Sequence, residues 1–279
     1  MKKFSIALLL LAFSVLLAAC GSGNDDSKSG EGEGKGDKII IGASNVPHAE
    51  ILEQAKPILE KDGIELEIVT YTDYVVPNKA LAEGELDANY FQHIPYLESQ
   101  IKENDYDFVN AGGIHIEPIG VYSKKYKSLD ELPKGAEIIM SSSVADHGRI
   151  LTMLENQGLI TLKEGIDKTT ATVDDITENP KELKFKTDVE AAMLPQIYNN
   201  EDADAILINS NYAIDAGLNP VEDSIAIEDA DSPYVNVIAV QSGDEESDKI
   251  KKLVEVLHSE EIQDFINKEY GGAVVPVSE

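Results

Sequence analysis

Short runs rich in β-branched residues alternate with amphipathic stretches over most of this chain, and this alternation restricts its fold more than any other feature. The runs that predict strands are residues 39–42, 66–69, 108–110, 114–122, 137–140, 183–186, 205–208 and 234–240. The stretches that predict helices are residues 48–61, 77–83, 94–103, 148–157, 189–199, 211–216, 248–258 and 260–268. Strands that alternate with helices favour an α/β fold with largely parallel sheets.

Two stretches, residues 113–123 and 232–240, are both extended and apolar. If both cross between two α/β lobes, residues 38–121 plus 236–279 form lobe 1 and residues 122–235 form lobe 2. The cleft of such a hinged clamp would lie at the crossings. The alternative is that both stretches are ordinary strands of a single sheet.

The N-terminus has the pattern of an export signal. Lys2 and Lys3 precede an apolar run at residues 4–17, which is too short for a membrane span and ends in small residues before Cys20. Cys20 is the only cysteine in the sequence, so it cannot form an internal disulfide. We therefore predict a lipoprotein signal peptide at residues 1–19 and a lipid on Cys20, which would anchor the protein to the extracellular face of the cell membrane.

Residues 20–37 contain only Gly, Ser, Asn and charged residues after the cysteine, a composition typical of a flexible tether. Removal of residues 1–19, which hold two lysines and no acid, leaves 21 basic and 52 acidic side chains and a formal net charge of −31. Such a chain is repelled by nucleic acid and by anionic lipid headgroups, so no nucleic-acid partner is expected. Membrane attachment would depend on the lipid anchor.

Aromatic residues gather in two segments, residues 71–78 and 88–97, although only 6% of the sequence is aromatic. Rings at strand ends usually serve packing. The same rings could instead enclose a flexible or sulfur-containing ligand side chain.

Arg149 is the only arginine in the sequence and lies where a helix is expected to begin. Its planar guanidinium can bind a carboxylate through two parallel hydrogen bonds, which lysine does poorly. The alternatives are a surface position or an ion pair with one of the many acids.

Two asparagines interrupt or end apolar runs: Asn209 follows residues 205–208 and Asn236 lies inside residues 234–240. A buried amide needs partners, because leaving it unpaired costs about 1–3 kcal/mol. Each could be satisfied by neighbouring backbone, or could bind the ammonium and carboxylate groups of a zwitterion.

Motifs for other chemistry are missing from the sequence, which has no GxSxG, GxxxxGK or HExxH pattern. An extracellular metal-ion receptor remains an alternative, with ligands drawn from His48, His93, His115 and His147, although these lack metal-ligand spacing. A surface hydrolase with an acid pair is a further alternative. No cofactor and no enzymatic activity are expected.

Several segments together resemble the NlpA/MetQ family of methionine-binding lipoproteins, the extracellular receptors of methionine ABC importers. They are PHAEIL at 47–52, YTDYVVPNKALAEGELDANYFQHIPYLE at 71–98, HIEPIGVYSKKYKSLDELPKGA at 115–136, LINSNYAIDAGLNP at 207–220, SPYVNVI at 232–238 and YGGAVVPV at 270–277. The resemblance implies a two-lobe (type II) periplasmic-binding-protein fold that closes over methionine and delivers it to a permease and, through it, an ATPase.

The resemblance also implies roles for single residues. Tyr74, Phe91, His93 and Tyr96 would surround the methionine side chain, and Arg149 would hold the carboxylate. Asn209 and Asn236 would complete the polar end of the site. One departure is the loop at residues 141–147, which lacks the proline and asparagine that many members have before Gly-Arg. The ligand could therefore be L-methionine, D-methionine, the sulfoxide or a methionine dipeptide.

Overall fold

The computed structural model describes residues 37–277. Cys20, the predicted signal peptide and all of the predicted tether except Asp37 lie outside the described residues. Between residues 37 and 277, no helix combines the length and the apolar character that crossing a membrane requires.

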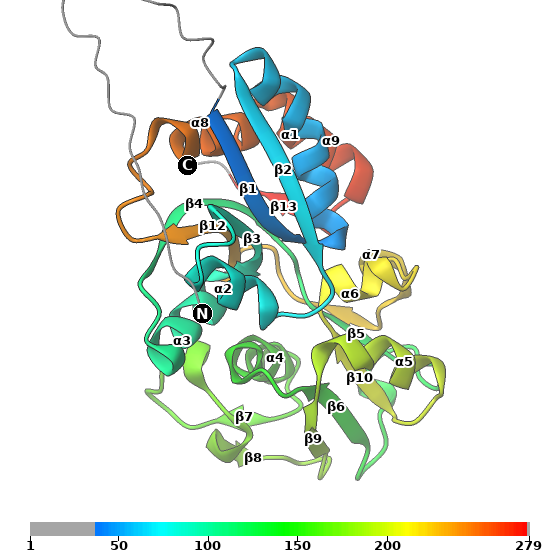
Figure 1. Ribbon diagram of the computed structural model, residues 1–279. Helices are drawn as coiled ribbons and strands as arrows, with labels where there is room; N and C mark the ends of the chain where they lie inside the picture. The colour runs from blue at the N-terminus through cyan, green and yellow to red at the C-terminus, as the bar shows by residue number, and fades with distance from the viewer. Residues whose placement is uncertain (1–36, 278–279) are drawn as a thin grey trace, which may run out of the picture. The chain divides into compact units, whose positions relative to one another are not determined.

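The first of two large sheets has six strands in the order β13-β4-β12-β3-β1-β2. They are β1 (Asp37–Ser44), β2 (Ile64–Tyr71), β3 (Ala88–His93), β4 (Phe108–Ile116), β12 (Val235–Gln241) and β13 (Val275–Pro276). One face packs against α1 (Glu50–Lys61), α8 (Asp248–Leu257) and α9 (Glu260–Tyr270), as Figure 1 shows. The other face packs against α2 (Val76–Ala82) and α3 (Ile94–Asn104).

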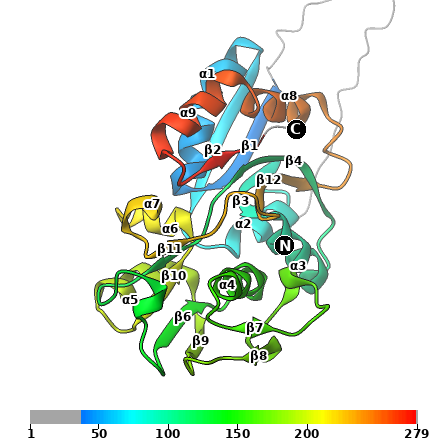
Figure 2. The same cartoon turned by 180° about the vertical axis from the view of Figure 1, so that it is seen from behind.

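The second sheet has five strands in the order β11-β5-β10-β6-β9. They are β5 (Gly120–Tyr122), β6 (Glu137–Ser141), β9 (Lys184–Val189), β10 (Ala205–Ile208) and β11 (Ala226–Ile227). Helix α4 (Val144–Asn156) contributes to the core on one face, and α5 (Leu194–Asn199) and α6 (Ser210–Asp215) contribute on the other. Figure 2 shows α4 between this sheet and the helices α2 and α3 of the first sheet.

The chain passes between the two sheets at two places. It leaves the first sheet after Ile116 and enters the second at Gly120, and it returns between Ile227 and Val235. The strand predicted at residues 114–122 is therefore two strands, one in each sheet. Pro118 lies at the break, where its missing N–H and fixed φ interrupt strand pairing.

The pairing of the strands is mixed, so the prediction of largely parallel sheets is wrong. β1 runs parallel to β2 and β3, and β6 runs parallel to β9 and β10. β12 runs antiparallel to β3 and β4, and β5 runs antiparallel to β10 and β11. The four strands that flank the two crossings, β4, β5, β11 and β12, all take part in antiparallel pairs, and β13 also runs antiparallel to β4.

Some boundaries also differ from the prediction. Val189 ends β9, and α5 begins only at Leu194 after a short 3-10 turn at Ala191–Met193. Four small features lacked a clear signal: α7 (Pro220–Asp223), β11, β13 and the antiparallel pair of β7 (Thr161–Leu162) with β8 (Ile176–Glu178). The α/β fold class is confirmed, and the exact lobe boundaries stay a prediction.

Candidate functional site

A pocket lies where segments from both sheets meet, with about 360 Å³ of space including its opening to solvent. All seven residues that the sequence pointed to as ligand contacts line it. The full lining is Tyr74, Phe91, Gln92, His93, Tyr96, Glu117, Asp146, Arg149, Asn209, Asn211 and Asn236.

Aromatic rings form one wall of the pocket. Tyr74 lies 6.1 Å from Phe91 and 5.9 Å from Tyr96, measured between ring centroids. The Tyr96 hydroxyl donates to the Tyr74 carbonyl at 3.0 Å, and the Tyr74 hydroxyl donates to Asn211 Oδ1 at 2.6 Å. These hydrogen bonds fix two rings whose hydroxyls would otherwise be buried without partners.

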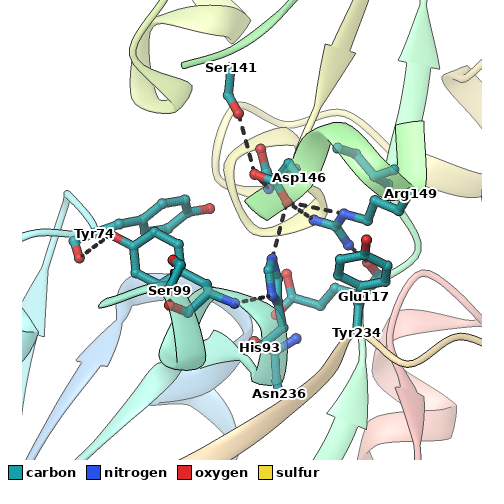
Figure 3. Close-up of polar contacts among 12 residues, drawn as sticks. Tyr74, His93, Ser99, Glu117, Ser141, Asp146, Arg149, Tyr234 and Asn236 are labelled. Atoms are coloured by element: carbon teal, nitrogen blue, oxygen red, sulfur yellow. Dashed lines mark hydrogen bonds and ion pairs between the residues drawn. The ribbon is translucent and has the colours of Figure 1, made fainter. Parts of the chain in front are cut away.

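His93 connects the aromatic wall to the polar side. It ends β3 and caps α3, because its Nδ1 accepts the Tyr96 backbone N–H at 3.1 Å. The proton of the neutral ring must then lie on Nε2, which donates to Asp146 Oδ1 at 3.1 Å. Figure 3 shows Asp146 between His93, Ser141 and Arg149.

Arg149 is buried and faces several protein oxygens. Its Nε and Nη2 donate to Asp146 Oδ1 at 3.1 and 2.7 Å, and its Nη1 lies 3.3 Å from the Glu117 carbonyl and 3.4 Å from Glu228 Oε2. Its carbon Cζ also lies 5.0 Å from the centre of the Tyr234 ring, a cation–π distance. The orientation of the guanidinium is therefore fixed, because four of its five N–H groups have a hydrogen-bond acceptor among residues 37–277.

The two charges stabilise each other. Burial opposes the ionisation of Asp146, but Arg149, His93 and Asn209 outweigh it and hold the pKa of this carboxyl well below its usual range. Burial likewise opposes the charge of Arg149, and Asp146 with Glu228 raises its pKa above the usual value. Both groups are therefore charged at neutral pH.

Glu117 lies in the connection between β4 and β5 and faces the pocket. Its Oε1 accepts from His115 Nε2 at 2.8 Å and lies 3.2 Å from His48 Nε2, and its Oε2 accepts the Asn211 backbone N–H at 3.1 Å. Burial raises its pKa, while His48 and Arg149 lower it in part. A buried carboxylate in a pocket wall can bind the ammonium group of a ligand.

The asparagines have different partners. Asn209 Nδ2 donates to Asp146 Oδ2 at 3.2 Å, while Asn209 Oδ1 is buried with no hydrogen-bond partner among the described residues. Asn236 Oδ1 lies 3.1 Å from His48 Nε2. The unpaired oxygen of Asn209 is an acceptor that a ligand N–H could satisfy.

The four histidines considered as metal ligands do not converge. His48 and His115 lie together with Glu117, with one possible ligand atom of each within 4.8 Å of the others. His93 instead contacts Asp146, and His147 Nε2 contacts the Ser141 carbonyl at 2.9 Å. The spacing at His48, His115 and Glu117 could hold a metal ion, but each group already has a protein hydrogen-bond partner.

Sequence reasoning missed Asp146 and Glu117. Asp146 precedes Arg149 by three residues, the spacing of an ion pair on one helix face. Glu117 is the only acid in the apolar stretch at residues 113–123. Among the 52 acids of the chain, neither signal stands out without the fold.

Two sheets covered by helices, joined by two crossings and enclosing a polar pocket at their junction define a two-lobe periplasmic-binding-protein fold. The sequence profile described as NlpA lipoprotein matches residues 39–278. The chain therefore belongs to the NlpA lipoprotein family.

Named relatives and solved structures agree with this assignment. The chain is 52% identical to the methionine-binding lipoprotein MetQ of Bacillus subtilis (strain 168), with 100% of each chain covered. It is similar to the structure of a pheromone cOB1 precursor/lipoprotein of the YaeC family from Enterococcus faecalis V583, with 60% identity and a TM-score of 0.84 over 86% of this chain and 100% of that one. It is also similar to a nutrient binding protein from Burkholderia cenocepacia bound to methionine, with 44% identity and a TM-score of 0.81 over 86% and 100% of the two chains.

Proposed function

We propose that this protein is an extracellular receptor, anchored by a lipid on Cys20, that captures methionine and delivers it to an ABC importer. It would hand the amino acid to a permease and, through that subunit, serve an ATPase. The receptor performs no chemistry on its ligand. The names of the relatives, as methionine-binding proteins and as lipoproteins, support both the ligand and the anchor.

The observation that carries the proposal is the composition of one pocket. Its aromatic wall, made by Tyr74, Phe91 and Tyr96, stands opposite a polar end made by Glu117 and Arg149. A thioether is poorly solvated and polarizable, so ring contacts worth about 0.3–1.5 kcal/mol each favour methionine over polar amino acids. The opposite charges at the polar end match the two charges of a zwitterion.

We assign the polar contacts from the geometry of the side chains. The ligand carboxylate binds the remaining N–H of Arg149 Nη2, with Asn236 nearby, and the ligand ammonium binds Glu117 and the unpaired Oδ1 of Asn209. Asp146 keeps the guanidinium in place rather than contacting the carboxylate. His93 contacts the methionine side chain from the edge of the aromatic wall.

Lobe closure would couple binding to transport. The sheet membership of the strands supports a division close to the proposed lobes, residues 38–121 plus 236–279 and residues 122–235, although β5 of the second sheet already begins at Gly120 and β12 of the first at Val235. Because the pocket draws residues from both sheets, a ligand that contacts all of them favours the closed arrangement through its differential affinity. The permease would recognise this closed form.

The first prediction concerns Arg149. Arg149→Ala removes a charge-assisted hydrogen bond to the carboxylate, worth about 1.5–3 kcal/mol, so methionine should bind about 10- to 150-fold more weakly. Isothermal titration calorimetry measures the change, and Lys134→Ala, which removes an exposed charge that pairs with Glu182, is the matched control. Equal affinity of the Arg149→Ala and parent proteins would refute the carboxylate assignment.

Ligand screening separates this function from the metal-receptor alternative, which the cluster of His48, His115 and Glu117 keeps open. Methionine at 100 times its Kd should add about 2.7 kcal/mol to the free energy of unfolding. Leucine should stabilise the protein less at the same concentration, and glutamine less still. Stabilisation by zinc but not by methionine would favour the metal receptor.

A further inference from the structure

Behind the pocket wall lies a row of four buried side chains that ends on the Glu117 carboxylate. The Tyr90 hydroxyl contacts His115 Nδ1, and His115 Nε2 lies 2.8 Å from Glu117 Oε1. His48 Nε2 is hydrogen-bonded to Asn236 Oδ1 at 3.1 Å and lies 3.2 Å from the same Glu117 oxygen. Only Glu117 lines the pocket, and Tyr90, His115 and His48 are 0, 0 and 1% exposed.

The hydrogen-bond pattern determines which ring nitrogens in this row of side chains carry a proton. Glu117 Oε1 can only accept while the carboxylate is ionised, so His115 carries its proton on Nε2. His48 does so too, because its Nε2 faces two acceptors, Asn236 Oδ1 and Glu117 Oε1. His115 Nδ1 is then an acceptor for the Tyr90 hydroxyl. Burial lowers the pKa of His48 to about 4 and that of His115 to about 3, so both rings are neutral donors at neutral pH.

Neutral donors orient a carboxylate without cancelling its charge. The rings also pack tightly, with centroids 4.6 Å apart for His48 and Tyr90 and 5.0 Å apart for His48 and His115. On the opposite side, the Asn211 backbone N–H donates to Glu117 Oε2 at 3.1 Å. The carboxylate is therefore held from the first sheet through one oxygen and from the start of α6 through the other.

We propose that Tyr90, His115 and His48 are positioning residues that aim the Glu117 carboxylate at the ligand ammonium and thereby make the receptor selective for α-amino acids. This proposal rests on the proposed function. An analogue without the ammonium would leave the buried Glu117 charge unpaired, which lowers the binding affinity. The side chain cannot avoid this loss by turning away, because its neighbours hold it in place. The aromatic wall selects the side chain of the ligand, whereas the row of Tyr90, His115, His48 and Glu117 selects its amino group.

The test compares methionine with two analogues, 4-(methylthio)butanoate, which lacks the amino group, and 2-hydroxy-4-(methylthio)butanoate, which replaces it by a hydroxyl. In the parent protein both analogues should bind at least about 30-fold more weakly than methionine. Calorimetry with each ligand is then repeated on variants of the positioning residues. A role in positioning changes only the affinity for methionine, whereas a general structural role changes the affinity for all three ligands.

Tyr90→Phe removes only the hydroxyl at the end of the row that lies farthest from the pocket, and it should weaken methionine binding about threefold to tenfold. The matched control is Tyr122→Phe, because Tyr122 is equally buried and its hydroxyl has no partner among the described residues. His48→Leu should weaken methionine about tenfold, and His48→Gln, which keeps an N–H donor, should restore most of the affinity. Affinity for 4-(methylthio)butanoate should change less than twofold in all these variants.

Three results would overturn the proposal. The first is an equal loss of affinity for methionine and 4-(methylthio)butanoate in Tyr90→Phe, which would show that the row of side chains has only a structural role. The second is a parent protein that binds methionine tightly but binds the two analogues equally well, which would leave the proposed function intact. The third is micromolar zinc binding that His48→Leu abolishes, which would make His48, His115 and Glu117 a metal site. Failure of the parent protein to bind methionine at all would instead refute the proposed function.

Discussion

Arg149 is held by acidic groups and a carbonyl from three parts of the chain. Asp146 comes from the same helix, Glu117 from the first crossing and Glu228 from the second. Breaking a buried pair of this kind costs about 3–5 kcal/mol, because it leaves one charge unpaired. The single arginine of the chain therefore serves both the junction of the crossings and the proposed carboxylate site.

Buried neutral histidines make the stability depend on pH. The pKa values of His48 and His115 fall from 6.5 to about 4 and about 3 on burial. Between these values and 6.5 the unfolded chain binds more protons than the folded protein, so the free energy of unfolding falls as the pH falls. Each histidine contributes at most about 1.4 kcal/mol per pH unit to this decline, and the raised pKa of Glu117 acts in the opposite sense.

Urea titrations from pH 7 to pH 5 measure this dependence. In His48→Gln one of the two titrating rings is missing, so the free energy of unfolding should fall less steeply with acidification than in the parent protein. Parallel curves for the parent and the variant would show that His48 does not stay neutral in the folded protein.

Residue types at the site could be predicted in part from the sequence. Aromatic segments, a lone arginine and asparagines in apolar runs all point to residues that line the pocket. Asp146 and Glu117 could not be found in this way, because acids are abundant and only the fold shows which of them are buried. The engagement of the Arg149 guanidinium by Asp146 likewise depends on the start of α4, which lies four residues before the predicted one.

At the scale of elements, α4 positions the polar end of the site through close packing at Gly148. A Cβ at this position would meet the Lys168 carbonyl oxygen and would lie 2.6 Å from that of Thr169, both in the 3-10 turn Lys168–Thr170. Because these are backbone atoms, the contact cannot be relieved by turning a side chain. Glycine is thus required in a helix that would otherwise favour alanine.

Gly148→Ala should lower the free energy of unfolding by about 3 kcal/mol through overpacking, despite the better helix propensity of alanine. Urea denaturation measures the change. Thr152→Ala on the same helix is the control, and it should shift stability by less than about 1 kcal/mol. A Gly148→Ala protein as stable as the parent would show that α4 and the 3-10 turn do not pack as closely as described.

The order of strands and helices followed from hydrophobic spacing, whereas strand direction did not. Residues 113–123 carry the same apolar pattern on both sides of Pro118, so the sequence alone indicates one strand. Only the pairing of β4 with β12 and of β5 with β10 shows that the two halves belong to different sheets. Strand pairing is a long-range property that local periodicity does not encode.

At the scale of the folded body of residues 37–277, side chains join the two sheets outside the pocket lining as well as within it. Asn45 Nδ2, next to β1, donates to Asp215 Oδ1 at 2.7 Å, and the Tyr212 hydroxyl donates to the Thr72 carbonyl at 3.2 Å. These exposed contacts contribute little by themselves. In the proposed closure, the main contribution would come from the buried pocket, where a ligand would contact residues attached to both sheets.

A crystal structure of the protein grown with methionine would test the proposed binding mode. We expect one methionine in the pocket, with its sulfur among the rings of Tyr74, Phe91 and Tyr96. Its carboxylate should lie within hydrogen-bond distance of Arg149 and its ammonium within that distance of Glu117. Methionine bound outside this pocket, or bound with its carboxylate away from Arg149, would refute the proposed binding mode.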